Sequence, residues 1–237
     1  MKKTKREKII LNERWKIEEG VFDKSTLITL SRMMEKGLFN SIDYLISPGK
    51  EANVYRAKKG KSYVAVKIYK IETSNFLKRT LYLFGDKRFS QQKLNDRNLV
   101  YLFTSKEFKN LNSANKCIPV PTPYYHEKNV IVMSFLGEDG IPYSKLKEIV
   151  DKEDFYTIME QIRALYKCKL IHADLSWFNI LKGDKLYFID FGQSVPTTHP
   201  KADMFLKRDV KNIIDEFNKK FKMNLSLDKW LEYVKQI

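Results

Sequence analysis

Residues 171–179 read Ile-His-Ala-Asp-Leu-Ser-Trp-Phe-Asn, and the order of their polar groups makes this the most informative stretch of the chain. Asp174 precedes Asn179 by five positions. A carboxylate in such a loop orients an acceptor oxygen and takes its proton, and an amide oxygen a few residues later holds a magnesium ion against nucleotide phosphates. The stretch therefore predicts phosphoryl transfer, with Asp174 as catalytic acid/base and Asn179 as a metal ligand.

A second acidic group follows at the end of a short apolar run. Ile189-Asp190-Phe191-Gly192 places an acid eleven residues beyond Asn179, where its hard carboxylate oxygen can bind the same metal. An acid that only caps a β-turn would explain either piece alone. The two pieces in this order and spacing are typical of the catalytic and metal-binding loops of protein kinases.

Upstream, a lysine stands inside an otherwise apolar run, Val64-Ala65-Val66-Lys67. A charge in a buried strand requires an ionic partner, whereas a lysine on an exposed edge strand does not. Glu107, on a helix expected in the second half of residues 76–116, is the best-placed acid. We therefore expect a Lys67–Glu107 pair that directs the ammonium to the α- and β-phosphates of ATP.

The pattern around these motifs predicts an α+β fold with two lobes. Short β-branched and aromatic runs begin at residue 44 and are separated by turns at Pro48-Gly49 and at residues 58–61, which predicts an antiparallel three-strand meander. A further buried strand is expected at 129–136. We divide the chain into an N-terminal helical extension (1–40), a β-rich N-lobe with the nucleotide-binding sheet and a basic loop (41–136), and a helical C-lobe with the catalytic and metal-binding loops (137–237).

Apolar residues at helical spacing predict three further helices, at residues 24–36, 155–165 and 206–221. In the first of them, Ser25 is the expected N-cap, and Gly37 is placed to end the helix. Its expected buried face carries Leu27, Leu30 and Met34. The last helix is expected to close the chain.

The chain is strongly basic, with 44 Lys and Arg residues against 29 Asp and Glu residues and a net charge of +15. Such a balance favours polyanionic partners, either nucleic acid or nucleotide phosphates. The excess is concentrated between residues 76 and 116, where a basic loop is expected. The basic residues there are Lys78, Arg79, Lys87, Arg88, Lys93, Arg97, Lys106, Lys109 and Lys116.

The cysteine content and hydropathy suggest an intracellular, soluble chain. Cys117 and Cys168 are 51 residues apart and belong to no metal-binding motif, so we expect neither a zinc site nor a disulfide, and Cys168 is expected to be inert core. No run of about 18 apolar residues is present, and the basic start resembles no signal peptide. We therefore expect a cytoplasmic protein without a membrane partner.

Several parts of an ordinary kinase are missing. None of the nine glycines forms a G-x-G pair, so Ser47, Lys50 and backbone N–H groups of the turn at residues 47–55 are the expected phosphate donors. Ala173 stands where many kinases carry an arginine. Only 47 residues follow Asp190 and they contain no Ala-Pro-Glu, so no peptide-substrate lobe is expected.

These residues resemble the RIO-type atypical protein kinases, and within them the subfamily usually numbered one, in a short form of archaeal type. The resemblance runs from about residue 21 to 215 and is most specific at SPGKEANVY and IDFGQSV. The matching stretches are VFDKSTL (21–27), SPGKEANVY (47–55), GDKRF (85–89), EFKNL (107–111), VMSFLG (132–137), HADLSWFN (172–179) and IDFGQSV (189–195).

The resemblance implies a trimmed bilobal kinase fold that binds ATP and Mg²⁺. By this resemblance, Lys67 binds the ATP phosphates, Ser134 and Leu136 of the hinge contact adenine, and Met133 is the gatekeeper. Asp190 then serves both as metal ligand and as the site of an aspartyl-phosphate intermediate. The family acts in late maturation of the small ribosomal subunit, so the pre-ribosomal particle and its rRNA are the implied partners.

Two other functions remain as alternatives. The first is a small-molecule phosphotransferase of the antibiotic-kinase kind, which shares the H-x-D-x-x-x-x-N and I-D-F-G motifs. The stretch SPGKEANVY and the missing substrate lobe argue against it. The second is a non-catalytic RNA-binding module that uses only the basic face. The chain keeps all of the expected site residues, and a module without catalytic activity would have no reason to keep them. They are Lys67, Glu107, Asp174, Asn179 and Asp190.

Overall fold

Five antiparallel strands form the sheet of the N-lobe, in the order β1-β2-β3-β5-β4. The computed structural model of the chain describes residues 22–71, 82, 86 and 96–236. The first three strands form the meander that the sequence predicts. The strands are β1 (Ser41–Ser47), β2 (Ala52–Lys59), β3 (Ser62–Tyr69), β4 (Pro123–Glu127) and β5 (Val130–Ser134).

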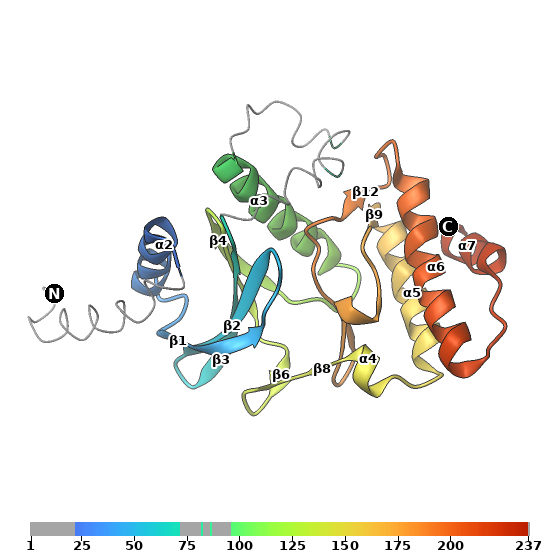
Figure 1. Cartoon of the computed structure of the whole chain (residues 1–237), viewed down its shortest axis with the longest axis horizontal. Coiled ribbons are helices and arrows are strands. Elements are labelled where there is room, and N and C mark those ends of the chain that lie inside the picture. Colours follow the sequence, from blue (N-terminus) through green and yellow to red (C-terminus); the bar gives the residue numbers. More distant parts are fainter. Residues whose placement is uncertain (1–21, 72–81, 83–85, 87–95, 237) are drawn as a thin grey trace, which may run out of the picture.

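The alternation of side chains along β3 gives the two faces of the sheet different tasks. Val64, Val66 and Ile68 pack in one cluster with residues of α2 (Lys24–Glu35), which lies on the outer face of the sheet (Figure 1). Lys67 and its neighbours on the opposite face point toward α3 (Asp96–Ala114) and the C-lobe. One strand therefore supplies both core and site residues.

The first helix, α2, differs in detail from its prediction. Its N-cap is Asp23, whose carboxylate accepts hydrogen bonds from the backbone amides of Ser25 and Thr26, so Ser25 is not the cap. Leu30 is buried as expected, but its partner on the buried face is Met33 and not Met34. Asp23 takes the cap position because its carboxylate accepts two amide hydrogen bonds at once.

Between the lobes lies α3, which crosses from the sheet toward the helices of the C-lobe (Figure 1). Five of the nine basic residues predicted for this region lie outside the described residues: Lys78, Arg79, Lys87, Arg88 and Lys93. Lys106 on α3 is completely buried, so it does not belong to a solvated basic face. The charge of the region is thus divided between surface and interior.

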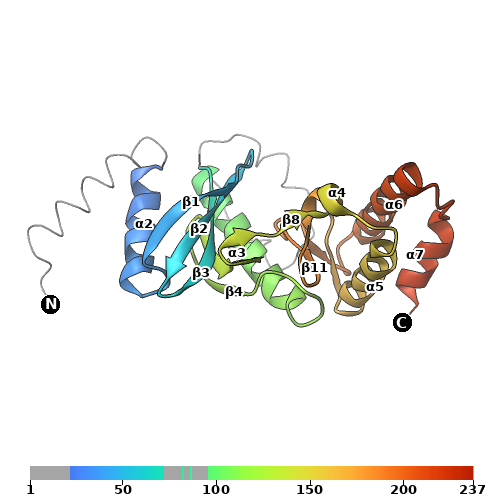
Figure 2. The same cartoon turned by 90° about the horizontal axis from the view of Figure 1, so that it is seen from below.

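Helices dominate the C-lobe, where the longest are packed side by side (Figure 2). The predicted helices are present as α5 and α6, but the chain does not close on α6, because α7 follows and packs against α5. The helices are α4 (Leu146–Ile149), α5 (Asp154–Lys167), α6 (Ala202–Phe221) and α7 (Leu227–Lys235), and the 3₁₀ helix η2 covers Trp177–Asn179.

Short strands join the lobes and hold the loops of the C-lobe. A three-stranded sheet has the order β11-β10-β8, and two pairs of strands complete the set. The division at residues 40/41 and 136/137 stays a prediction. The short strands are β6 (Gly137–Glu138), β7 (Ile141–Pro142), β8 (Ser144–Lys145), β9 (Leu170–Ile171), β10 (Ile180–Lys182), β11 (Leu186–Phe188) and β12 (Val195–Pro196).

A disulfide joins Cys117, which follows α3, to Cys168, the C-cap of α5, with 6.5 Å between their Cα atoms. The expectation of two unpaired cysteines with Cys168 as inert core is therefore wrong. Spacing along the chain gave no sign of the pair, because packing of α3 against the C-lobe brings the two helix ends together. The cysteines thus no longer support a reducing compartment.

No helix within residues 22–71 and 96–236 has the length and apolar character needed to cross a membrane. This finding agrees with the absence of a long apolar run in the sequence.

Candidate active site

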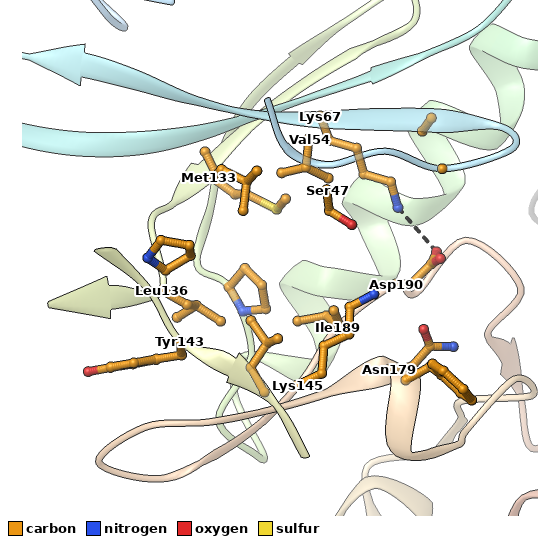
Figure 3. A pocket seen from close by; sticks show the side chains of 18 of the residues that line it. Ser47, Val54, Lys67, Met133, Leu136, Tyr143, Lys145, Asn179, Ile189 and Asp190 are labelled. Carbon is orange, nitrogen blue, oxygen red and sulfur yellow. Dashed lines mark hydrogen bonds and ion pairs between the residues drawn. The ribbon is translucent and has the colours of Figure 1, made fainter. Parts of the chain in front are cut away.

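A cavity of about 720 Å³ lies between the two lobes. Its upper wall comes from the β1–β2 turn and β3, and its lower wall comes from β8, η2 and residues 189–190 (Figure 3). Most of the predicted site residues line this cavity. They are Lys67, Glu107, Met133, Ser134, Leu136, Asn179 and Asp190.

Lys67 is buried on β3 and meets two carboxylates. Its Nζ lies 2.7 Å from Glu107 Oε1 on α3 and 3.1 Å from Asp190 Oδ1 in the C-lobe (Figure 3). Burial alone would lower the pKa of Lys67, but the carboxylates of Asp190 and Glu107 outweigh burial and raise the pKa above its usual value. The ammonium therefore stays charged within the cavity.

Glu107 has a second partner that sequence reasoning missed. The hydroxyl of Tyr69 donates to Glu107 Oε2, so both carboxylate oxygens are engaged and the acid is held toward the sheet. Tyr69 is buried two residues after Lys67 on the same strand. The strand period of two places both side chains on one face, and that signal was present in the sequence.

Asn179 and Asp190 lie on the same side of the cavity, near its lower wall (Figure 3). Nδ2 of Asn179 donates to the backbone oxygen of Asp174 at 2.8 Å, which fixes the amide. Within the described parts of the chain, no cluster of three or more His, Cys, Asp or Glu side chains is arranged to hold a metal. One amide oxygen and one carboxylate fit Mg²⁺, which is bound by few protein groups together with phosphate and water.

Unlike the other site residues, Asp174 does not line the cavity itself. Its Oδ2 accepts a hydrogen bond from Nε2 of Gln193 at 3.0 Å. Ala173 and Asp190 both have left-handed backbones, with φ of 63° and 67°. A non-glycine residue rarely adopts this conformation without strong constraints around it. The catalytic and metal-binding loops are therefore held by their surroundings.

One such constraint is Asp209 on α6. Its carboxylate accepts hydrogen bonds from the backbone amides of Ala173 and Leu175, at 2.7 and 3.0 Å. Burial raises the pKa of Asp209 to about 7, although the two amides and Arg208 favour its charged form. Sequence reasoning missed Asp209. An acid within the apolar stripe of α6 is a signal of the same kind as a lysine within the apolar run of β3, because a buried charge requires a partner.

His172 serves the loop as a structural residue. Its Nε2 lies 3.0 Å from the carbonyl oxygen of Ile189, so it links the catalytic loop to the strand before Asp190. Burial lowers the pKa of His172 to about 4, outweighing its hydrogen bond to Ile189 and the charge of Asp190. The imidazole is therefore neutral near pH 7.

The hinge segment after β5 forms the back of the cavity. Ser134 is tied to the preceding loop, because its backbone amide donates to Thr122 O at 2.8 Å and its hydroxyl accepts from Thr122 N at 2.9 Å. The carbonyl of Leu136 accepts from Tyr143. Met133, the predicted gatekeeper, is buried beside them. These bonds give the hinge a fixed shape.

The turn between β1 and β2 closes over the cavity where a glycine-rich loop would lie in an ordinary kinase. Gly49 permits this turn, because a Cβ at that position would lie 2.4 Å from the carbonyl oxygen of Ala52. Lys70 Nζ donates to Gly49 O at 2.7 Å and anchors the turn to the end of β3. Ser47 and Lys50 both line the cavity from this turn.

Comparison with known sequences identifies relatives over most of the chain. Residues 53–230 match the RIO domain family. The chain is 41% identical over 210 residues to the RIO-type serine/threonine-protein kinase Rio1 of Methanocaldococcus jannaschii, covering 86% of this chain and 72% of that protein. Rio1 of Thermoplasma acidophilum is 38% identical over 185 residues, covering 77% of this chain and 99% of that protein.

Other relatives are longer or more distant. Serine/threonine-protein kinase rio1 of Dictyostelium discoideum is 39% identical over 227 residues, which cover 91% of this chain but only 40% of that protein. Among solved structures, the Rio2 kinase of Chaetomium thermophilum, in a complex with ADP, Mg²⁺ and phosphoaspartate, matches with a TM-score of 0.66 at 21% identity, covering 90% of this chain and 67% of that chain. The likeness confirms the bilobal kinase-like fold. On the strength of the RIO domain match and the identity to Rio1 proteins, this chain belongs to the RIO kinase family.

Proposed function

We propose that this chain is a magnesium-dependent serine/threonine protein kinase or ATPase of the RIO type that acts in small ribosomal subunit maturation. The proposal rests above all on one observation, the contact of Lys67 with both Glu107 and Asp190 at the wall of a large cavity. Phosphoryl transfer requires a fixed cation for the phosphates beside a carboxylate that can bind the metal, and Glu107 holds the Lys67 ammonium in that place. The names of the relatives support the same activity.

Each site residue then has a distinct task. Lys67 binds the α- and β-phosphates, and Asn179 and Asp190 hold Mg²⁺. When bound, Mg²⁺ would supply positive charge that offsets the negative charge developing on the phosphates during transfer. Asp174 orients the acceptor hydroxyl or water and takes its proton. Ser134 and Leu136 face the adenine ring, and Met133 limits the depth of the pocket.

A covalent role of Asp190 is part of the proposal. Its carboxylate oxygen attacks the γ-phosphorus, the bond to the β-phosphate oxygen breaks, and ADP leaves. Water then attacks the aspartyl phosphate, which restores the carboxylate and releases phosphate. The phosphoaspartate in the Chaetomium Rio2 structure supports this step by analogy of fold.

The proposed partner is the pre-ribosomal small subunit, bound through its rRNA. The net charge of +15 supports a polyanionic partner, because each Lys or Arg that neutralises a phosphate releases counterions whatever the base sequence. A cytoplasmic location belongs to the same proposal and follows from the ribosomal partner, not from the cysteines.

Calorimetry of ATP binding with and without Mg²⁺ tests the core of the proposal. We expect Mg²⁺ to tighten ATP binding, because a metal held by Asn179 and Asp190 adds positive charge beside the phosphates. Equal affinity in the two conditions would remove the basis for the site.

A further inference from the structure

Two buried side chains of α3 hold the backbone that follows Asp190. Lys106 and Asn110 are both completely buried, and each donates to two carbonyl groups of residues 191–194. These bonds are Lys106 Nζ to Gly192 O (3.0 Å) and Ser194 O (2.5 Å), and Asn110 Nδ2 to Phe191 O (3.0 Å) and Ser194 O (2.9 Å).

The same backbone segment reaches the catalytic loop. Nε2 of Gln193 lies 3.0 Å from Asp174 Oδ2, and the hydroxyl of Ser194 donates to His172 O at 2.9 Å. Gln193 is itself buried, with 8% of its surface exposed. A continuous path of hydrogen bonds therefore runs from α3 through residues 191–194 to the carboxylate of Asp174.

The chemical type of these residues argues for a task beyond packing. A buried ammonium and a buried amide are costly unless they are hydrogen-bonded, and an apolar side chain would fill the same space at lower cost. Lys106, Glu107 and Asn110 lie within one turn of α3. Glu107 reaches Lys67, while the other two reach the segment after Asp190. One helix thus contacts both sides of the site.

We propose that Lys106 and Asn110 are positioning residues that fix the segment 191–194 and, through Gln193, align the carboxylate of Asp174 with the metal-binding Asp190. The inference rests on the proposed function, in which Asp174 and Asp190 act on the transferring phosphoryl group. It makes α3 the element that sets the distance between the two acids.

Three apolar variants test the path: Lys106→Met, Asn110→Leu and Gln193→Met. Asn112→Leu is the matched control, because Asn112 is an exposed asparagine of the same helix. We expect each of the three to lower kcat for ATP turnover roughly tenfold to hundredfold, since small misplacements of catalytic groups have effects of this size. ADP affinity without Mg²⁺ should stay within about twofold of the parent.

The half-saturating Mg²⁺ concentration distinguishes changes that affect Asp190 from changes that affect Asp174. Lys106→Met and Asn110→Leu loosen the backbone beside Asp190, so their half-saturating Mg²⁺ concentration should rise. Gln193→Met affects only Asp174, so its half-saturating concentration should stay at the parental value. The double variant Asn110→Leu/Gln193→Met should have a kcat near that of the slower single variant, because both changes act on Asp174 through one segment.

Parental kcat and Mg²⁺ dependence in folded Asn110→Leu and Gln193→Met would overturn the proposal. Multiplicative effects on kcat in the double variant would also overturn it. If Lys106→Met fails to fold, the other two variants decide, because neither removes a buried charge. Asp174→Ala in the same assay distinguishes failure of this inference from failure of the proposed function. Parental turnover in Asp174→Ala overturns both. An inactive Asp174→Ala beside a parental Gln193→Met overturns this inference alone.

Discussion

The ammonium of Lys67 lies 3.1 Å from the carboxylate of Asp190, a residue 123 positions later in the chain. This ion pair joins the N-lobe sheet to the metal-binding loop of the C-lobe. Both groups line the cavity, and the proposed function gives each a second task, phosphate binding for Lys67 and metal binding for Asp190. The ion pair therefore fixes the position of Asp190 relative to Lys67 in the chain without ligands.

Replacing Lys67 by Ala should weaken MgATP binding by roughly one to two orders of magnitude, because a buried cation that contacts phosphate is lost. Calorimetry with the Lys67→Ala protein measures the effect. Lys61→Ala is the matched control, since Lys61 is an exposed lysine in the turn just before the strand that carries Lys67. Unchanged affinity in a folded Lys67→Ala protein would contradict the assignment.

Asp174→Ala should lose most turnover and still bind MgATP. The carboxylate acts on the acceptor proton and lies outside the cavity wall, so nucleotide affinity should change little. Turnover and calorimetry are measured on the same preparation. Asp228→Ala, an exposed acid on α7, controls for loss of a negative charge. ATP hydrolysis at the parental rate in Asp174→Ala would show that the catalytic loop is assigned incorrectly.

Incubation with γ-labelled ATP should leave label on Asp190 that hydroxylamine removes. An acyl phosphate is cleaved by hydroxylamine, whereas a phosphoester of Ser or Thr is not. The label should be absent in Asp190→Asn. Because this change also weakens the metal site, Asn179→Ala at high Mg²⁺ is the control, and it should keep the labile label. Label found only on Ser or Thr would remove the covalent role.

Binding to small-subunit rRNA should weaken as salt rises. Replacing Lys87, Arg88, Lys93 and Arg97 by Ala should make the log–log salt slope shallower by roughly one for each contacting residue. The first three lie outside the described residues, and Arg97 is exposed on α3. The comparison protein carries four Lys→Ala changes at exposed C-lobe positions, Lys152, Lys167, Lys201 and Lys229. Equal salt slopes in the two quadruple variants, with ATP turnover retained, would mean that the four basic residues make no contact with RNA phosphates.

Reduction of the Cys117–Cys168 bond should lower the free energy of unfolding. The bond closes a stretch of 51 residues, and the restriction of the unfolded chain is worth about 2–4 kcal/mol. Urea unfolding with and without a thiol reductant measures the difference. The Cys117→Ser/Cys168→Ser protein should be less stable and insensitive to reductant. Two titratable thiols in the untreated, unfolded protein would contradict the bond.

Local features of this protein follow from patterns of neighbouring residues. The spacing of Asp174, Asn179 and Asp190 indicated the catalytic and metal-binding loops. Short β-branched and aromatic runs between turns placed the three-strand meander, and apolar residues at spacings of three and four placed most of the helices, because that spacing reflects burial of one helix face. A charge inside an apolar strand was enough to expect a partner for Lys67.

Contacts between distant residues become visible in the folded chain alone. It pairs Lys67 with Asp190 as well as Glu107, adds Tyr69 and Asp209 to the supports of the site, and buries Lys106, one of the nine basic residues between positions 76 and 116. It also joined the two cysteines. These contacts span 34 to 123 residues of chain or depend on which face of a helix turns inward. Such contacts follow from the packing of whole elements against one another, which no local pattern specifies.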